Sequence, residues 1–119
     1  MSESQTLEAD LEVARELTAF QRNILVILSE EPRYGLAIKR ELEAYYDSEV
    51  NHGRLYPNLD DLVEMGLVEK SELDKRTNQY ALTDDGYQTI LDQVGWMFSK
   101  MATGDERVAD LESLIERAR

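Results

Sequence analysis

The chain has 119 residues, 42% of them hydrophobic, which suits one domain with a small appendage. It carries 25 Asp and Glu against 13 Lys and Arg, a net charge of −12, and it has no cysteine. The missing cysteine excludes disulfides, thiol catalysis and cysteine-ligated metal centres. No apolar run approaches the ~20 residues of a membrane-spanning helix. Residues 1–5 are polar and acidic, unlike a secretory signal, so we expect a cytoplasmic protein.

The first two expected helices lie on either side of a capping box. Residues 1–17 are expected to hold an amphipathic N-terminal helix, because Leu7, Leu11, Ala14 and Leu17 recur at helical spacing. The sequence Thr-Ala-Phe-Gln at 18–21 matches a capping box and precedes an apolar run, which predicts a fresh helix over about 19–29.

Two further helices are predicted before residue 66. The second helix of this part should carry one apolar stripe, formed by Tyr34, Ala37, Ile38, Leu42 and Tyr45. A third helix over about 52–65 should bury Leu55, Leu59, Leu62 and Val63, with Ser48 or Asn51 as its N-cap. Pro57 crowds the carbonyl of Gly53, so we expect this helix to become regular only after about residue 54. Gly66 should end it in a left-handed conformation.

A β-hairpin and two C-terminal helices complete the pattern. Short strands are predicted at 67–70 and 79–82, joined by a polar connection over 71–78. Thr83 or Asp84 should cap a helix over about 85–101, and a last amphipathic helix follows Gly104. The chain is therefore expected to be mainly α (α+β), a winged helix-turn-helix over 18–84 with a two-stranded wing, followed by dimerisation helices over 85–119.

Four segments in the same order resemble the PadR-type regulators. Residues 34–38 (YGLAI) are similar to the family's "YGYEI", and residues 51–59 (NHGRLYPNL) to its "G-TLYP-L" recognition helix. Residues 62–68 (LVEMGLV) and 79–86 (QYALTDDG) resemble the passages into and out of the wing. The acidic, cysteine-free composition resembles that of haloarchaeal members, adapted to high salt. The resemblance implies a winged-helix transcriptional regulator that binds DNA.

The expected DNA contacts come from the outer face of the third helix, the wing and the second helix. Early positions of a recognition helix reach base edges in the major groove, where Arg pairs with guanine and Asn with adenine. The wing offers cations to phosphates or to the minor groove. The candidate DNA-binding residues are Asn51, His52, Arg54, Asn58, Lys75, Arg76, Arg33, Lys39 and Arg40.

Two departures from the family pattern make these contacts less certain than the fold. Arg54 stands where the family has Thr, and residues 74–78 lack its Gly-rich wing tip. Each candidate also has a plain structural interpretation as a solvated surface charge, and His52 can equally well serve the start of its helix.

The acidity is the main difficulty for a DNA-binding function. Segments 1–17, 18–83 and 84–119 each carry −4, and Asp60 and Asp61 lie in the predicted recognition helix. Because phosphate neutralisation normally supplies much of the affinity, we hypothesise that weakly bound cations mediate contact with DNA. No other cofactor and no metal site is expected, and the sequence identifies no small-molecule effector.

A homodimer is expected, because one recognition helix reads few base pairs and such motifs act as two-fold pairs. The C-terminal helices carry more apolar surface than a small winged helix can bury. The expected interface residues are Leu7, Leu11, Val94, Met97, Phe98, Met101, Val108, Leu111, Leu114 and Ile115. The alternative interpretation of these stripes is that both helices fold back on their own domain.

Two other functions remain to be weighed. A winged-helix module that binds proteins and not DNA would explain the acidity and the pair Asp60–Asp61. An enzyme is not expected, because the sequence shows no nucleophile–base motif, no phosphate-cradling Gly loop and no metal-ligand cluster.

Overall fold

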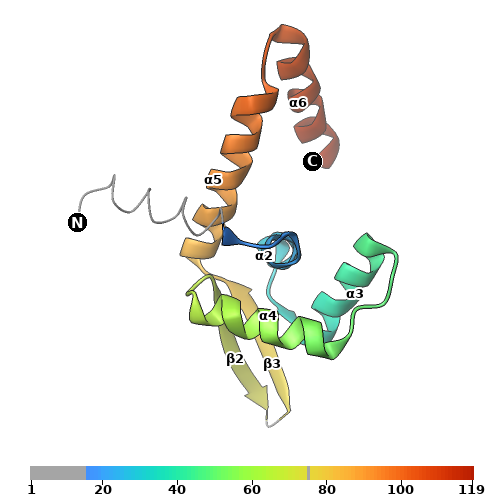
Figure 1. The fold of residues 1–119 in the computed structure, drawn as a ribbon, viewed down its shortest axis with the longest axis vertical. Coiled ribbons are helices and arrows are strands. Elements are labelled where there is room, and N and C mark those ends of the chain that lie inside the picture. The colour runs from blue at the N-terminus through green and yellow to red at the C-terminus, as the bar shows by residue number, and fades with distance from the viewer. Residues whose placement is uncertain (1–15, 75) are drawn as a thin grey trace, which may run out of the picture.

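The computed structural model describes residues 16–74 and 76–119. The N-terminal helix expected over 1–17, with Leu7 and Leu11, lies outside the described residues except for its last two positions, and so does Lys75. The described elements follow the order α2 (Ala19–Glu30), β1 (Arg33–Tyr34), α3 (Gly35–Tyr46), α4 (His52–Glu64), β2 (Val68–Asp74), β3 (Thr77–Leu82), α5 (Asp84–Met101) and α6 (Asp105–Ala118) (Figure 1). This is a winged helix-turn-helix followed by two C-terminal helices, as predicted.

Side-chain caps fix where three of the helices begin. Thr18 Oγ1 accepts from the N–H of Gln21, whose side chain accepts from the N–H of Thr18, so the predicted capping box at α2 is confirmed. The side chain of Asn51 caps α4 by accepting from the N–H of Arg54, and that of Thr83 caps α5 by accepting from the N–H of Gly86. Each cap satisfies backbone N–H groups that have no partner within their helix.

Helix α4 is regular from its first residue, contrary to the expectation that Pro57 would delay it. The helix begins at His52 and contains Pro57, and the N–H of Leu55 already donates to the carbonyl of Asn51 at 3.1 Å. The carbonyl that Pro57 deprives of a donor belongs to Gly53, in the exposed first turn, where solvent can replace the missing bond. Gly66, at φ 78°, ends the helix in the left-handed region, as expected.

The sheet is larger than predicted. Strands β2 and β3 extend over 68–74 and 77–82, so most of the expected polar connection 71–78 is strand. A third, two-residue strand, β1, pairs antiparallel with β3, Arg33 opposite Tyr80 and Tyr34 opposite Gln79, which gives the order β1-β3-β2. This pairing ties the start of α3 to the wing.

The core lies where α2, α3 and α4 meet and is closed on one side by the sheet. Its buried residues are Leu17, Phe20, Ile24, Leu25, Leu28, Ile38, Leu42, Val50, Leu55, Leu59, Leu62, Leu67, Val68 and Tyr80. The stripe predicted for α3 is correct at Ile38 and Leu42 and wrong at Tyr34 and Tyr45, which are exposed. Tyr46 packs against Phe20 instead, with ring centroids 6.1 Å apart.

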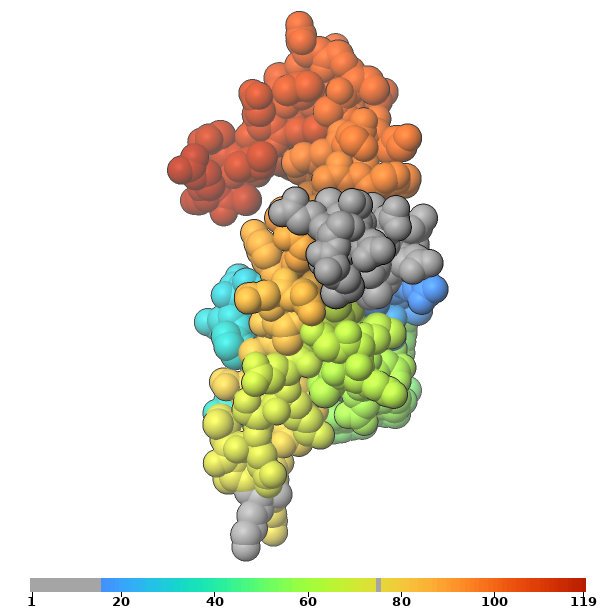
Figure 2. Space-filling model, turned by 90° about the vertical axis from the view of Figure 1, so that its left-hand side faces the viewer, coloured from blue at the N-terminus to red at the C-terminus, as the bar shows by residue number. Residues whose placement is uncertain are grey.

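The far end of α5 and all of α6 stand away from the winged helix, at the opposite end of the molecule from the wing (Figures 1 and 2). Most apolar side chains expected at the dimer interface are exposed there: Met97, Met101, Val108, Leu114 and Ile115. Val94 and Phe98 are half-buried, and Leu111 is buried within the chain. Of the eight expected interface residues on α5 and α6, all within the described part of the chain, five are therefore exposed.

Candidate nucleic-acid interface

The start of α4 presents polar and basic groups to solvent. Asn51, His52 and Arg54 are exposed, and Asn51 Oδ1 is occupied by the N–H of Arg54 at 2.8 Å. The His52 ring stacks on Tyr56, with centroids 5.5 Å apart. Asn51 is thus held as a cap, while the side chains of His52 and Arg54 remain available to a ligand.

An aromatic surface orients the guanidinium of Arg54. Its Cζ lies 4.0 Å from the ring centroid of Phe20 and 5.9 Å from that of Tyr46. A guanidinium over a ring face is attracted by the ring quadrupole and keeps its edge N–H groups free. Arg54 is therefore partly ordered before any partner binds.

Asn58 differs from the expectation of an outward, base-reading side chain. It is half-buried, Gln21 Nε2 donates to its Oδ1 at 3.2 Å, and its own Nδ2 donates to the carbonyl of Arg54 at 2.7 Å. Both ends of the amide are thus used within the protein. This arrangement joins the capping box of α2 to the first turn of α4.

The three basic residues expected near the second helix, Arg33 of β1 and Lys39 and Arg40 of α3, are not equally free to bind a ligand. The Arg33 guanidinium is bound by Glu30, Glu31 and Glu41, and only 14% of its side chain is exposed. Lys39 pairs with Glu43 at 3.3 Å. Arg40 is exposed and has no ion pair with the described residues. Of these three, Arg40 is the one best able to bind a phosphate.

The wing tip is organised by Asp74. Its Oδ1 accepts from the N–H of Arg76 at 2.9 Å, and this bond, with a further one from Thr77, lowers the pKa of the Asp74 carboxyl below its ordinary value of 3.8. The bond shapes the turn and leaves the Arg76 side chain exposed.

The carboxylates of α4 lie away from its first turn. The first turn of the helix contains no acid, whereas Asp60, Asp61 and Glu64 are exposed in its second half. Any repulsion of phosphates by this helix is therefore concentrated in the half that follows Pro57.

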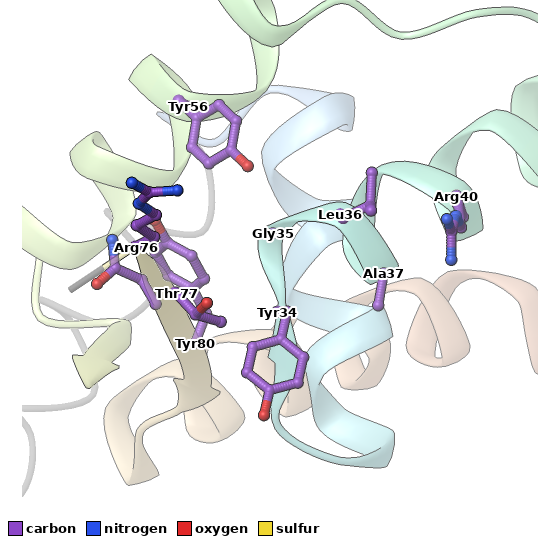
Figure 3. Close-up of a pocket in the computed structure, with 10 residues that line it drawn as sticks. Tyr34, Gly35, Leu36, Ala37, Arg40, Tyr56, Arg76, Thr77 and Tyr80 are labelled. Atoms are coloured by element: carbon purple, nitrogen blue, oxygen red, sulfur yellow. The ribbon is translucent and has the colours of Figure 1, made fainter. Parts of the chain in front are cut away.

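A pocket of about 560 Å³ separates the start of α3 from the wing (Figure 3). The pocket is lined by the start of α3, by Tyr56 of α4 and by the wing, namely Tyr34, Gly35, Leu36, Ala37, Arg40, Tyr56, Arg76, Thr77, Asn78 and Tyr80. Sequence reasoning named Arg40 and Arg76 but missed the contribution of Tyr56 and Tyr80. No periodic signal shows it, because these residues are brought together by the pairing of β1 with β3 and by the approach of Tyr56 to Gly35.

The model of the PadR-like family of transcriptional regulators matches residues 24–92. The chain belongs to the PadR-like family. Its relatives in that family are transcriptional regulators and not enzymes. No curated protein matches the chain.

Solved structures place this PadR-like chain close to RosR. RosR of H. salinarum, in crystals grown from NaBr, is 62% identical, with a TM-score of 0.85, over 88% of this chain and 96% of that one. A structure described as the complex hsRosR-S4 is 60% identical, with a TM-score of 0.89, over 92% and 95%. A PadR-like transcription factor from Bacteroides fragilis, 19% identical over 83% and 88% with a TM-score of 0.58, shares the fold.

Metal sites and membrane-spanning helices are two further features to consider in this PadR-like chain. Across residues 16–74 and 76–119, no three His, Cys, Asp or Glu gather closely enough to hold a metal ion. In the same part of the chain, no helix is both long and apolar enough to cross a membrane.

Proposed function

We propose that this PadR-like chain binds double-stranded DNA sequence-specifically as a homodimer, with α4 in the major groove and the wing on the backbone or minor groove. The observation that carries the proposal is the exposed, acid-free first turn of α4 with an ordered Arg54. Tyr56 of α4 and Arg76 of the wing line one pocket, so both elements face the same side. A regulator of this kind acts beside the chromosome, in agreement with the cytoplasmic location expected from the sequence.

The structural environment ranks the proposed contacts. His52, Arg54, Arg40 and Arg76 have exposed side chains, and Lys75 joins them on sequence grounds. Asn51, Asn58, Arg33 and Lys39 are engaged within the protein, so their contribution to DNA affinity is expected to be smaller.

A gel shift against the chain's own upstream region at high ionic strength tests DNA binding. Arg54→Ala should weaken specific binding about tenfold, because one good base contact contributes about 1–3 kcal/mol of discrimination. Arg117→Ala, which removes the same charge from exposed α6, should change affinity less than twofold. Equal effects of both substitutions would mean that only net charge matters.

A module that binds another protein is the second candidate, favoured by the exposed carboxylates of Asp60 and Asp61. This candidate predicts that the protein shifts no DNA fragment in a gel at any salt concentration. It also predicts that Arg54→Ala leaves the fold intact.

The homodimer is proposed to form through the C-terminal helices, residues 85–119, together with the N-terminal segment 1–17. Met97 and Met101 are 45% and 48% exposed on α5, and Leu114 and Ile115 are each 50% exposed on α6. Several large apolar side chains left exposed on the same two helices are typical of an interaction site.

Light scattering at high salt tests the dimer. Wild-type chains should show twice the protomer mass, and the pair Met97→Glu with Met101→Glu should reduce it to one protomer. Leu73→Glu, at an equally exposed position of the wing, should leave the dimer intact. A monomeric wild type would refute this part of the proposal.

A further inference from the structure

Helix α5 is joined to the end of α4 across the base of the wing. Strand β2 begins and strand β3 ends at this base, where Val68 pairs with Leu82. Gly66 and Leu67 follow α4 on one side, and a single residue, Thr83, connects β3 to α5 on the other. The helix with the proposed DNA contacts and the helix with the proposed dimer contacts are therefore linked by very little chain.

The Thr83 hydroxyl makes two hydrogen bonds at this junction. Its oxygen accepts from the N–H of Gly86 at 3.0 Å, which caps α5, and the hydroxyl donates to the carbonyl of Gly66 at 2.7 Å. The backbone N–H of Thr83 also donates to the carbonyl of Leu67 at 3.1 Å. Capping requires only an acceptor, whereas the bond to Gly66 requires a donor, so the two roles of the hydroxyl can be separated by substitution.

The segments on both sides of this hydroxyl are fixed. Gly66 has a φ of 78°, and the N–H of Leu67 donates to the carbonyl of Leu62 at 3.0 Å, so the end of α4 is closed. Gly86 is buried, and a Cβ on it would lie 2.2 Å from the carbonyl oxygen of Leu67. Ile90 of α5 packs against the core, but apolar contact is non-directional, whereas a hydrogen bond has a preferred direction. The Thr83 hydroxyl thus favours one direction for α5.

A small change of angle at this junction would be large at the other end of α5. The helix has 18 residues and leads away from the wing (Figure 1). At about 1.5 Å per residue it is about 27 Å long, so a tilt of about 10° at its base would move its far end by about 5 Å. One base pair of DNA rises only about 3.4 Å. Met97 and Met101 of the proposed dimer interface lie toward that far end.

We propose that the Thr83 hydroxyl is a positioning group that sets the angle between α4 and α5, and with it the spacing of the DNA half-sites that the dimer binds. The inference rests on the proposed function, DNA binding as a homodimer. Dimers of helix-turn-helix proteins bind half-sites about one helical turn apart, so the spacing they prefer follows from their own geometry. Thr83 acts through α5 and needs no contact with DNA.

Two substitutions separate the bond to Gly66 from the cap of α5. Thr83→Ser keeps a hydroxyl and therefore both hydrogen bonds. Thr83→Asp keeps a strong N-cap acceptor, but its carboxylate cannot donate to the carbonyl of Gly66. Urea unfolding checks that both variants are folded. Should the aspartate variant not fold, Thr83→Gly, which an N-cap position also tolerates, takes its place.

The first measurement compares affinities for operators whose half-sites are moved apart or together by one base pair. The wild type and Thr83→Ser should prefer the original spacing by about tenfold, because a displaced half-site loses base contacts. Thr83→Asp should bind the original operator several-fold more weakly and should lose most of this preference. The ratio is taken within each variant, so the added charge cancels. A variant that was only less stable would lose affinity equally for every spacing.

The second measurement needs no DNA. The chain has no cysteine, so Asp61→Cys on α4 and Ser99→Cys on α5 place two spin labels at exposed positions. An excess of unlabelled chain leaves at most one labelled protomer in each dimer. The distance between the labels should be narrowly distributed with Thr83 or Thr83→Ser, and broader or displaced with Thr83→Asp.

The two measurements together decide the proposal. Altered label distances with a lost spacing preference in Thr83→Asp support it. Unaltered distances overturn it, and so do altered distances with the spacing preference of the wild type. If the wild type binds no DNA, the proposed function fails, and the label distances alone decide whether Thr83 positions α5.

Discussion

At the scale of single residues, Asn58 acts as a link between helices. It accepts from Gln21, 37 positions earlier in the chain, and donates to the backbone of Arg54 in the same turn of α4. Gln21 in turn holds the N–H of Thr18. The orientation of the exposed Arg54 therefore depends on a polar chain that begins at the first residue of the winged helix.

A double-mutant cycle measures this link. Gln21→Ala and Asn58→Ala should each destabilise the protein, and the two effects should be non-additive by about 1 kcal/mol, the usual net value of one hydrogen bond. Urea unfolding at constant protein and salt concentration provides the free energies. Strictly additive effects, with DNA affinity lost only in Asn58→Ala, would show instead that Asn58 reads a base.

Glu43 of α3 likewise links two segments, because it binds the backbone of the turn between α3 and α4. Its Oε2 accepts from the N–H of Val50 at 3.0 Å, and this bond, followed by Lys39, lowers the pKa of the Glu43 carboxyl below its ordinary value of 4.5. A carboxyl whose folded pKa is depressed stabilises the fold above its unfolded pKa. That contribution is lost as the pH falls below 4.5 through the folded pKa.

The lowered pKa of Glu43 determines how the stability of the variant Glu43→Gln should depend on pH. The variant should melt below the wild type at pH 6, and the difference in Tm should shrink as the pH falls from 4.5 to 3. Glu69→Gln removes the same charge from an exposed position of β2 and controls for net charge. A gap in Tm that widens on acidification would contradict the assigned role.

At the scale of elements, the sequence predicts the helices well and the sheet less well. Caps at Thr18, Asn51 and Thr83 are local signals, and each lies where its helix begins. Strand β2 has a single buried residue, Val68, so alternation of polar and apolar residues cannot reveal its length. Strand β1 has two residues and exists only through its pairing with β3.

The sequence likewise predicts one part of the candidate interface and misses another. The exposure of Arg54 and Arg76 follows from helix period and turn position, which a sequence contains. The bonds of Asn58 to Gln21 and the cluster of carboxylates around Arg33 join residues through the fold, and local patterns do not report them. The pocket was missed for that reason as well.

The close packing of α5 against the start of β2 requires a residue without a side chain at Gly86. A Cβ on Gly86 would lie 2.2 Å from the carbonyl oxygen of Leu67 and 2.7 Å from Leu82 Cδ1. Gly86→Ala should therefore destabilise the protein by about 2–3 kcal/mol, because backbone must move. Gly53→Ala, whose Cβ would meet only Asn51 Oδ1 at 3.4 Å, should gain about 0.5–1 kcal/mol. Urea unfolding of the two variants checks the contrast, and equal stabilities would refute it.

At the scale of the whole molecule, charge must be reconciled with DNA binding. The chain carries −12, so the proposed dimer would approach DNA with twice that charge. The pocket lining and the first turn of α4 contain no Asp or Glu, but Asp60 and Asp61 lie further along the same helix. We infer that cations gather between these carboxylates and the phosphates when the complex forms.

Uptake of cations changes the sign of the usual salt dependence. An ordinary basic protein releases counterions from DNA, and its affinity falls steeply as salt rises. Here affinity should stay level or rise as potassium chloride increases from 0.1 M to the molar range, measured by fluorescence anisotropy on one operator fragment. Asp60→Asn with Asp61→Asn should bind more tightly at low salt and lose affinity as salt rises. Asp105→Asn with Glu106→Gln removes the same charge from α6 and should keep the wild-type slope. A steep fall for the wild type would show that counterion release dominates and that the acidic residues take no part in the contact.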